Sequence, residues 1–182
     1  MARFVHALAL GLVGAGIVHL SILFLLPAHS VRDVWTRLSQ VGEPYATLRL
    51  DAAGQDGLPA PADPFIQAAA CRFDLAEGML HLAAEGTVPF WSISIYDDNG
   101  LNVFSITDGA AADGRLDAVV LAPAQARRLH SRYAAQTDRS VLLQANVGRG
   151  IALVRVFVPD ETWQGVATAF LESLRCAPLP LE

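Results

Sequence analysis

Lysine is absent from the 182-residue chain, and all 13 of its basic side chains are arginine. Without a lysine there is no Schiff-base nucleophile, no P-loop lysine and no Ser-x-x-Lys acylation motif. The formal net charge is −5, and the basic residues form no stripe along the chain. Since nucleic-acid binding depends on neutralising phosphates, the sequence predicts no nucleic-acid partner.

Sequence signatures of catalysis and metal binding are also missing. We find no G-x-S-x-G, no G-x-G-x-x-G and no H-x-H or H-E-x-x-H pattern. The five histidines are isolated: His6, His19, His29, His81 and His130. We expect His81, inside an alternating segment, to face solvent or a satisfied partner. The sequence therefore predicts no catalytic residue, no cofactor and no metal ligand, and it points away from an enzyme without excluding one.

Charge of either sign is absent from Phe4 to Val31. The apolar run over residues 4–27 would form a helix about 36 Å long, enough to cross a ~30 Å hydrocarbon core. We expect a retained transmembrane anchor over residues 1–29. The alternative is a signal peptide cleaved after Val13-Gly14-Ala15, but the apolar run continues for a dozen residues beyond Ala15.

The flanking charges do not decide the orientation of this span. Arg3 precedes it, and Arg32 and Arg37 follow it beside Asp33. The short N-terminal tail and the large following domain favour a signal anchor with its N-terminus in the cytoplasm and its C-terminal domain outside it. We expect a single-pass protein of the inner membrane of a Gram-negative bacterium. Its C-terminal domain is then expected in the periplasm.

One face of the predicted span carries small residues at four-residue spacing: Ala7, Gly11, Ala15 and then His19. Small residues at this spacing allow a second helix to approach closely. His19 is the only ionisable group deep in the span, and interhelical hydrogen bonding is its simplest role. We expect this face to pack against another helix, although alanine and glycine are common throughout the chain.

Residues 30–64 are expected to form a short interfacial helix and a linker. Ser30 can cap a helix over residues 30–40, in which Trp35 suits the membrane interface. Proline and glycine are frequent from Gly42 to Pro64, where residues 45–50 form the one strand candidate. Asp63-Pro64 is typical of a helix start and predicts a brief helix over residues 63–70.

Residues 65–182 are predicted to form one mostly β domain, because two-residue periodicity dominates from Cys71 onward. Strands are expected over residues 71–75, 78–85, 89–96, 101–107, 115–121, 141–147 and 150–158. The turn Asp97-Asp98-Asn99-Gly100 predicts one hairpin, and Gly148-Arg149 predicts another between the last two strands. Helices are expected over residues 123–133 and 160–176, the latter capped by Asp160 with Trp163, Val166, Phe170 and Leu174 as its apolar stripe. The expected fold class is α+β: an antiparallel sandwich, jelly-roll-like, with packed helices.

Only two cysteines occur, Cys71 and Cys176. In an oxidising compartment they most simply form one disulfide, which would join the C-terminal helix to the first strand of the main sheet. Two free buried thiols are the alternative. Neither cysteine has a second ligand at metal-binding spacing.

The acidic turn after residue 96 resembles the beginning of a calcium loop, but the later ligands and the distant glutamate are missing, so a plain hairpin turn is expected. If the domain holds a pocket or an interface, Trp91, Tyr96 and Asp97 are its candidate residues.

The order of an apolar span, CRFDL, PFWSISIYDDNGLNVFSI, LAPAQ and VRVFVPD resembles the DUF 1254 family. The resemblance covers most of the chain after the anchor and consists of strand and aromatic positions. It implies a β-rich, jelly-roll-like fold that longer members carry in front of a DUF 1214 module. It implies no catalytic residues, and the present chain would be a short form without the second module.

Together these patterns predict a membrane-anchored periplasmic accessory or assembly subunit of a cell-envelope complex. The expected partners are the lipid bilayer and another protein, for example a separate DUF 1214-type chain. The alternative is an envelope enzyme or a small-ligand or lipid carrier with a pocket in the β domain.

Overall fold

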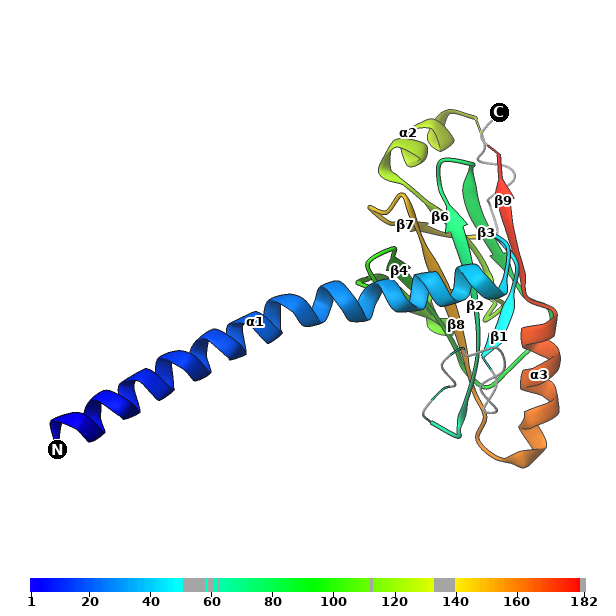
Figure 1. Ribbon diagram of the computed structural model, residues 1–182. Helices are drawn as coiled ribbons and strands as arrows, with labels where there is room; N and C mark the ends of the chain where they lie inside the picture. The colour runs from blue at the N-terminus through cyan, green and yellow to red at the C-terminus, as the bar shows by residue number, and fades with distance from the viewer. Residues whose placement is uncertain (51–57, 59–60, 62, 112, 133–139, 181–182) are drawn as a thin grey trace.

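The computed structural model describes residues 1–50, 58, 61, 63–111, 113–132 and 140–180; the side chains of residues 26–33 and 130–132 are not described. A long N-terminal helix projects from a β domain that carries two shorter helices (Figure 1). The helices are α1 (Ala2–Val41), α2 (Pro123–Arg132) and α3 (Gln164–Glu172). The strands are β1 (Leu48–Leu50), β2 (Ile66–Asp74), β3 (Met79–Ala83), β4 (Trp91–Asp97), β5 (Asn102–Thr107), β6 (Asp117–Leu121), β7 (Val141–Gln144), β8 (Arg149–Phe157) and β9 (Arg175–Leu179).

Helix α1 contains the predicted span. Its first 24 residues, Ala2–Leu25, have a mean hydropathy of 2.3, and none of its most apolar stretch is buried in the protein. The helix then continues without a break to Val41, so the expected second helix over residues 30–40 is part of α1. The predicted separation into two helices is therefore wrong. Proline removes one backbone hydrogen bond from a helix, and apolar helices of this length tolerate that loss. The predicted cap at Ser30 falls on a side chain outside the described ones.

Sheet A has the strand order β1-β2-β8-β4-β5, with every pair antiparallel. The predicted alternation in β4 is confirmed, because Trp91, Ile93 and Ile95 all point into the core. The β4–β5 hairpin also forms where the Asp97–Gly100 turn predicts it, with Gly100 at a positive φ of 77°. Gly150 of β8 lies where a Cβ atom would collide with the carbonyl oxygen of Tyr96.

Sheet B has the order β7-β6-β3-β9, and its β6–β7 pair is parallel. The predicted hairpin between residues 141–147 and 150–158 is therefore wrong: β7 joins sheet B, whereas β8 lies between β2 and β4 in sheet A. A turn signal such as Gly148-Arg149 reverses the chain locally, but partner choice depends on which neighbours bury the apolar strand. Strand β8 buries Ala152, Val154 and Val156 in the core between the sheets.

The helix predicted over residues 63–70 is also absent, because Ile66 begins β2. Asp63 accepts a hydrogen bond from the backbone N–H of Phe65 at 2.9 Å, as in a turn. Ala68, Ala69 and Ala70 are fully buried between β1 and β8. Alanine favours helices by local propensity, but at this position sheet pairing overrides that weak preference.

The last predicted helix is shorter than expected. Asp160 accepts a hydrogen bond from the N–H of Thr162 at 2.8 Å, as predicted for a cap, at the start of a 3-10 turn over Glu161–Trp163. Helix α3 ends at Glu172, and residues 175–179 form β9 at the edge of sheet B. The buried residues of α3 are Ala167, Phe170 and Leu171. Of the predicted apolar stripe, only Phe170 is a buried residue of this helix.

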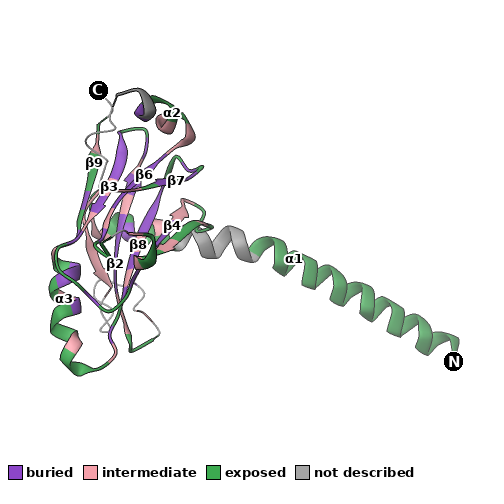
Figure 2. Ribbon diagram, turned by 180° about the vertical axis from the view of Figure 1, so that it is seen from behind, coloured by how far each residue is buried: buried purple, intermediate pink, exposed green. Residues whose placement is uncertain are grey.

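The core lies between the two sheets, and Figure 2 shows buried residues concentrated on their strands. Cys71 of β2 and Cys176 of β9 are joined in a disulfide, which connects sheet A to sheet B. Cys176 lies on a strand and not on the predicted helix. The prediction of a mostly β, α+β domain behind one apolar N-terminal helix is confirmed.

Candidate functional site

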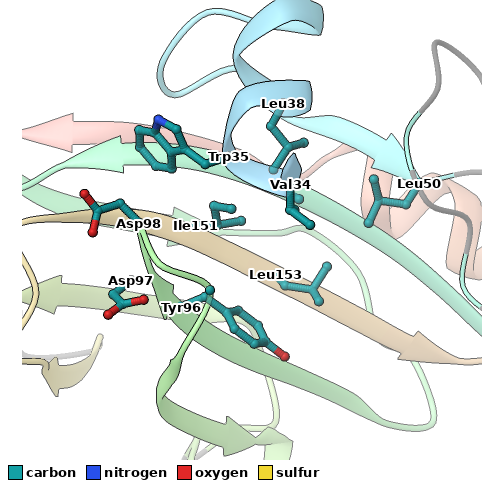
Figure 3. A pocket seen from close by; sticks show the side chains of 11 residues that line it. Val34, Trp35, Leu38, Leu50, Tyr96, Asp97, Asp98, Ile151 and Leu153 are labelled. Carbon is teal, nitrogen blue, oxygen red and sulfur yellow. The ribbon is translucent and has the colours of Figure 1, made fainter. Parts of the chain in front are cut away.

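A groove of about 280 Å³ lies where the end of α1 crosses the outer face of sheet A (Figure 3). Val34 and Leu38 point from α1 toward Ile151 and Leu153 of β8. The remaining lining comes from α1, from β1 and β2, and from the β4–β5 hairpin: Trp35, Leu50, Ala70, Tyr96, Asp97, Asp98 and Gly100. The groove is therefore mostly apolar, with carboxylates at one end.

Two side chains of α1 hold the helix on the sheet. Leu38 is only 2% exposed and packs in a small core with Leu58, Ala70 and Ile151. The guanidinium groups of Arg72 and Arg149 lie 5.3 Å and 5.8 Å from the centroid of the Trp35 ring. Both distances are within the range of cation–π attraction, so Trp35 is held by two strands of sheet A.

Helix α1 ends against the same part of the sheet. Arg72 donates from one terminal nitrogen to the carbonyl oxygen of Gly42 at 2.6 Å. The Nε atom of Arg72 is buried and has no hydrogen-bond partner among the described residues. The last turn of α1 therefore contacts β2 through both apolar and polar groups.

The carboxylates at the end of the groove are already engaged. Asp97 accepts hydrogen bonds from the backbone N–H groups of Asn99 and Leu101, at 2.9 Å and 2.8 Å. Asp98 forms an ion pair with the Nε atom of Arg149 at 2.7 Å. The turn therefore is the plain hairpin turn expected from the sequence. Among the described residues no group of three or more His, Cys, Asp or Glu side chains could hold a metal ion.

Tyr96 and Arg155 provide the polar character beside the groove. Arg155 donates from its two terminal nitrogens to the Ser94 hydroxyl and the Tyr96 hydroxyl, each at 3.0 Å. Ser105 of β5 donates to Ser94 at 3.1 Å. This arrangement can bind a hydrogen-bonding group, but it holds no histidine or carboxylate base beside a hydroxyl nucleophile.

Only two of the three pocket candidates from the sequence lie in the groove. Tyr96 and Asp97 line it, whereas Trp91 is buried between the sheets and donates from its indole nitrogen to the carbonyl oxygen of Gly114 at 2.7 Å. The sequence analysis missed Trp35, Leu38 and Ile151 as lining residues. The type and position of Trp35 predict a place at the membrane interface, whereas the structure shows its ring against Arg72 and Arg149 of sheet A.

A second polar cluster lies on sheet B, away from the groove. Asp117 accepts hydrogen bonds from Ser140 at 2.7 Å and pairs with the Nε2 atom of His81 at 3.0 Å, both through Oδ1. His81 therefore has a partner, as expected. Burial would raise the pKa of Asp117, but these two hydrogen bonds and the nearby positive charge outweigh it, and the pKa is lowered. Because the carboxylate stands between Ser140 and His81, the order of a catalytic triad is not reproduced.

Two other groups have shifted pKa values, and neither lines the groove. Burial raises the pKa of Tyr45, whose hydroxyl donates to the carbonyl oxygen of Asp74 at 2.7 Å. The hydroxyl and backbone N–H of Thr162 hold the pKa of Asp160 below its ordinary value. Both shifts belong to turns that shape the fold.

Fold and groove define a class: a β domain of two packed sheets docked on the end of one apolar helix long enough to span a membrane.

No family model matches the chain, and no curated protein matches it. Among solved structures, the VPA0106 protein from Vibrio parahaemolyticus matches 66% of this chain at 11% identity with a TM-score of 0.45. An uncharacterised protein from Burkholderia cenocepacia matches 82% at 15% identity with a TM-score of 0.48. The chain covers only 32% and 43% of these two proteins.

Proposed function

We propose that this protein is a membrane-anchored accessory subunit of a cell-envelope complex, with its β domain in the periplasm and a protein partner beside the membrane. The membrane part of the proposal is supported by the apolar, unburied span Ala2–Leu25. The Cys71–Cys176 disulfide fits an oxidising compartment. The resemblance to the DUF 1254 family adds a possible partner class, a separately encoded DUF 1214-type chain.

The observation that carries the proposal is apolar surface on the side of the domain nearest the span. In the β4–β5 hairpin, Leu101 is 67% exposed and Phe104 is 36% exposed. Gly100 of the same hairpin and Val34 of α1 both line the groove. Val34 follows Pro27, the end of the predicted apolar run, by seven residues, or about 10 Å along the helix, so this part of the domain would lie close to the membrane surface. Exposed apolar surface in this position favours a partner at the membrane surface.

Because α1 is continuous, it joins two candidate contact regions: the small-residue face of the predicted span and the domain surface beside the groove. At 100° per residue, Gly11 lies about 180° around the helix from Leu38, which packs on sheet A. A second membrane helix could therefore pack against the face of Ala7, Gly11, Ala15 and His19 without meeting the domain. Within the described part of the chain, a Cβ atom at Gly11 would have no neighbour within 4 Å, so a larger side chain there would not disturb the protomer itself.

The first experiment tests location. A reporter that is active only in the periplasm, fused after Glu182, is expected to be active. The mature protein is expected to begin at Met1 or Ala2. A mature N-terminus at Gly16 would show that the anchor is removed. An inactive periplasmic reporter together with an active cytoplasmic reporter would show that the C-terminal domain lies in the cytoplasm.

The second experiment tests the complex. The protein is extracted from its native membrane in mild detergent and separated on native gels. Gly11→Ile is expected to weaken the complex because a branched side chain separates neighbouring helices. The matched control is Gly16→Ile, about 140° away on the same helix, where a Cβ atom would also meet open space. A wild-type protein that migrates as a monomer would contradict the proposal.

The groove favours a second candidate, a carrier of a small apolar ligand or of a lipid tail. Its volume of about 280 Å³ is at the lower end for ligand pockets, and its lining is mostly apolar. Native mass spectrometry of the detergent-purified protein would test this by detecting a co-purified lipid. Leu153→Arg is expected to abolish that adduct; an adduct that persists would place the lipid elsewhere.

A further inference from the structure

The β5 edge of sheet A differs from the other three strand edges of the described domain. Edge strands invite pairing with another chain unless they are short, charged or interrupted by proline. Strands β1 and β7 have three and four residues, and β9 contains Pro178 and Arg175. Strand β5 has six residues, NVFSIT, with neither a charge nor a proline. Its pairing with β4 shifts register between Ile95 and Tyr96, so residues 104–107 form the regular part of this edge.

The core-facing side of β5 is incompletely covered. Phe104 pairs with Ile95, and Ile106 pairs with Ile93, so all four side chains point to the same face. Ile93 and Ile95 are completely buried, but Phe104 is 36% exposed and Ile106 is only partly buried. An additional strand beside β5 would cover both side chains and satisfy the open backbone groups.

We propose that a β-strand of a different polypeptide, uncharged and apolar on its core-facing side, extends sheet A by pairing with β5. This inference rests on the proposed function and specifies how the partner binds. Main-chain hydrogen bonds would supply affinity, and alternate side chains that fit against Phe104 and Ile106 would supply specificity.

The position of α1 argues for a different polypeptide and against a second copy. From Val34 to Val41 the helix passes from the β4–β5 hairpin to β1, across the strands of sheet A (Figure 1). Two copies joined through the same strand edge are related by a two-fold axis perpendicular to the sheet or parallel to the strand. Both axes are perpendicular to α1 and would reverse it in the second copy. The two anchors could not then enter one membrane from the same side.

The direct test places a photo-crosslinking amino acid, benzoyl-phenylalanine, at residues 105 and 107 of the full-length protein in its native membrane. Both positions are exposed and pair with Ser94 and Ser92 on the face of β5 away from the core. We expect crosslinks to one segment of another polypeptide, with the attachment site moving by two residues for each two-residue step along β5. Residues 175, 177 and 179 of β9 serve as control positions and should give no such ladder. Crosslinks to the same chain, to lipid alone or to scattered sites would overturn the inference.

Matched substitutions provide a second readout. Ser105→Glu puts a charge on β5, and Ala177→Glu puts one on β9; both original residues are small and exposed, and Arg155 and His81 lie near them. We expect Ser105→Glu to reduce the amount of complex on native gels about ten-fold, equivalent to about 1.4 kcal/mol, and Ala177→Glu to leave it unchanged. Thermal unfolding of both variants reports whether the domain is intact. If the wild-type complex forms and both variants retain it, strand addition at β5 is wrong while the proposed function stands; if no wild-type complex forms, both fail.

Discussion

The guanidinium group of Arg72 lies 5.3 Å from the centroid of the Trp35 ring, so a strand of sheet A is in direct contact with helix α1. Arg149 approaches the same ring at 5.8 Å. With Leu38 buried one turn later, these contacts attach α1 to the domain. The orientation of the domain therefore follows the orientation of α1.

Replacing Trp35 tests this attachment. Trp35→Ala removes both cation–π contacts and part of the apolar docking surface, and we expect it to lower the free energy of unfolding by about 1–3 kcal/mol. Limited proteolysis should cut the chain near the end of α1 faster than in the wild type. Thr36→Ala, at the adjacent exposed position, is the control and should change neither measurement. Equal cleavage rates in Trp35→Ala and wild type would show that the contacts do not hold the helix.

The disulfide between Cys71 and Cys176 spans 105 residues of sequence. In the chain-entropy model a loop of that length stabilises the fold by about 4–5 kcal/mol at most. We expect Cys176→Ser, and likewise the double variant with Cys71→Ser, to lower the melting temperature. Reductant should lower it in the wild type but not in the double variant. Non-reducing mass analysis of exported protein that finds two free thiols would contradict the pairing and weaken the periplasmic assignment.

Gly150 allows β8 to approach the backbone of β4. An added methyl group would meet the carbonyl oxygen of Tyr96 and would lie 3.0 Å from the Phe73 ring. We expect Gly150→Ala to destabilise the domain by about 1–3 kcal/mol through overpacking, measured by chemical denaturation. Gly148→Ala is the matched control, because a Cβ atom there meets no neighbour within 4 Å. Similar losses in both variants would mean that close approach is not the cause.

Asp117 should make the free energy of unfolding depend on pH in the acid range. Its pKa is lowered in the folded state, so the carboxylate stabilises the fold above its unfolded pKa of about 3.9. That contribution is lost as the pH falls from there through the folded pKa. We expect Asp117→Asn to have a flatter stability curve than wild type below about pH 4. Asp113→Asn, an exposed control, should retain the wild-type curve; an unchanged slope in Asp117→Asn would contradict the assignment.

Several features could be predicted from residues that lie close together in the sequence. The apolar run predicted the span, and alternating burial together with Asn99-Gly100 predicted the β4–β5 hairpin. Pro123 correctly marked the start of α2, and Asp160 correctly marked the turn before α3. Each of these features depends on residues close together in the chain, where periodicity and capping act directly.

Partner choice between distant segments was decided by tertiary structure. The sequence predicts a β7–β8 hairpin from its local turn signal, but β8 lies between β2 and β4 and buries Ala152, Val154 and Val156 in the core there. Ala68–Ala70 have helical propensity and still form a strand, because long-range pairing exceeds a weak local preference. The groove lined by Trp35 and the open edge of β5 also depend on tertiary structure. The groove forms only when α1 docks on sheet A, and the edge is defined only when the strands have paired, so neither is visible in a local sequence pattern.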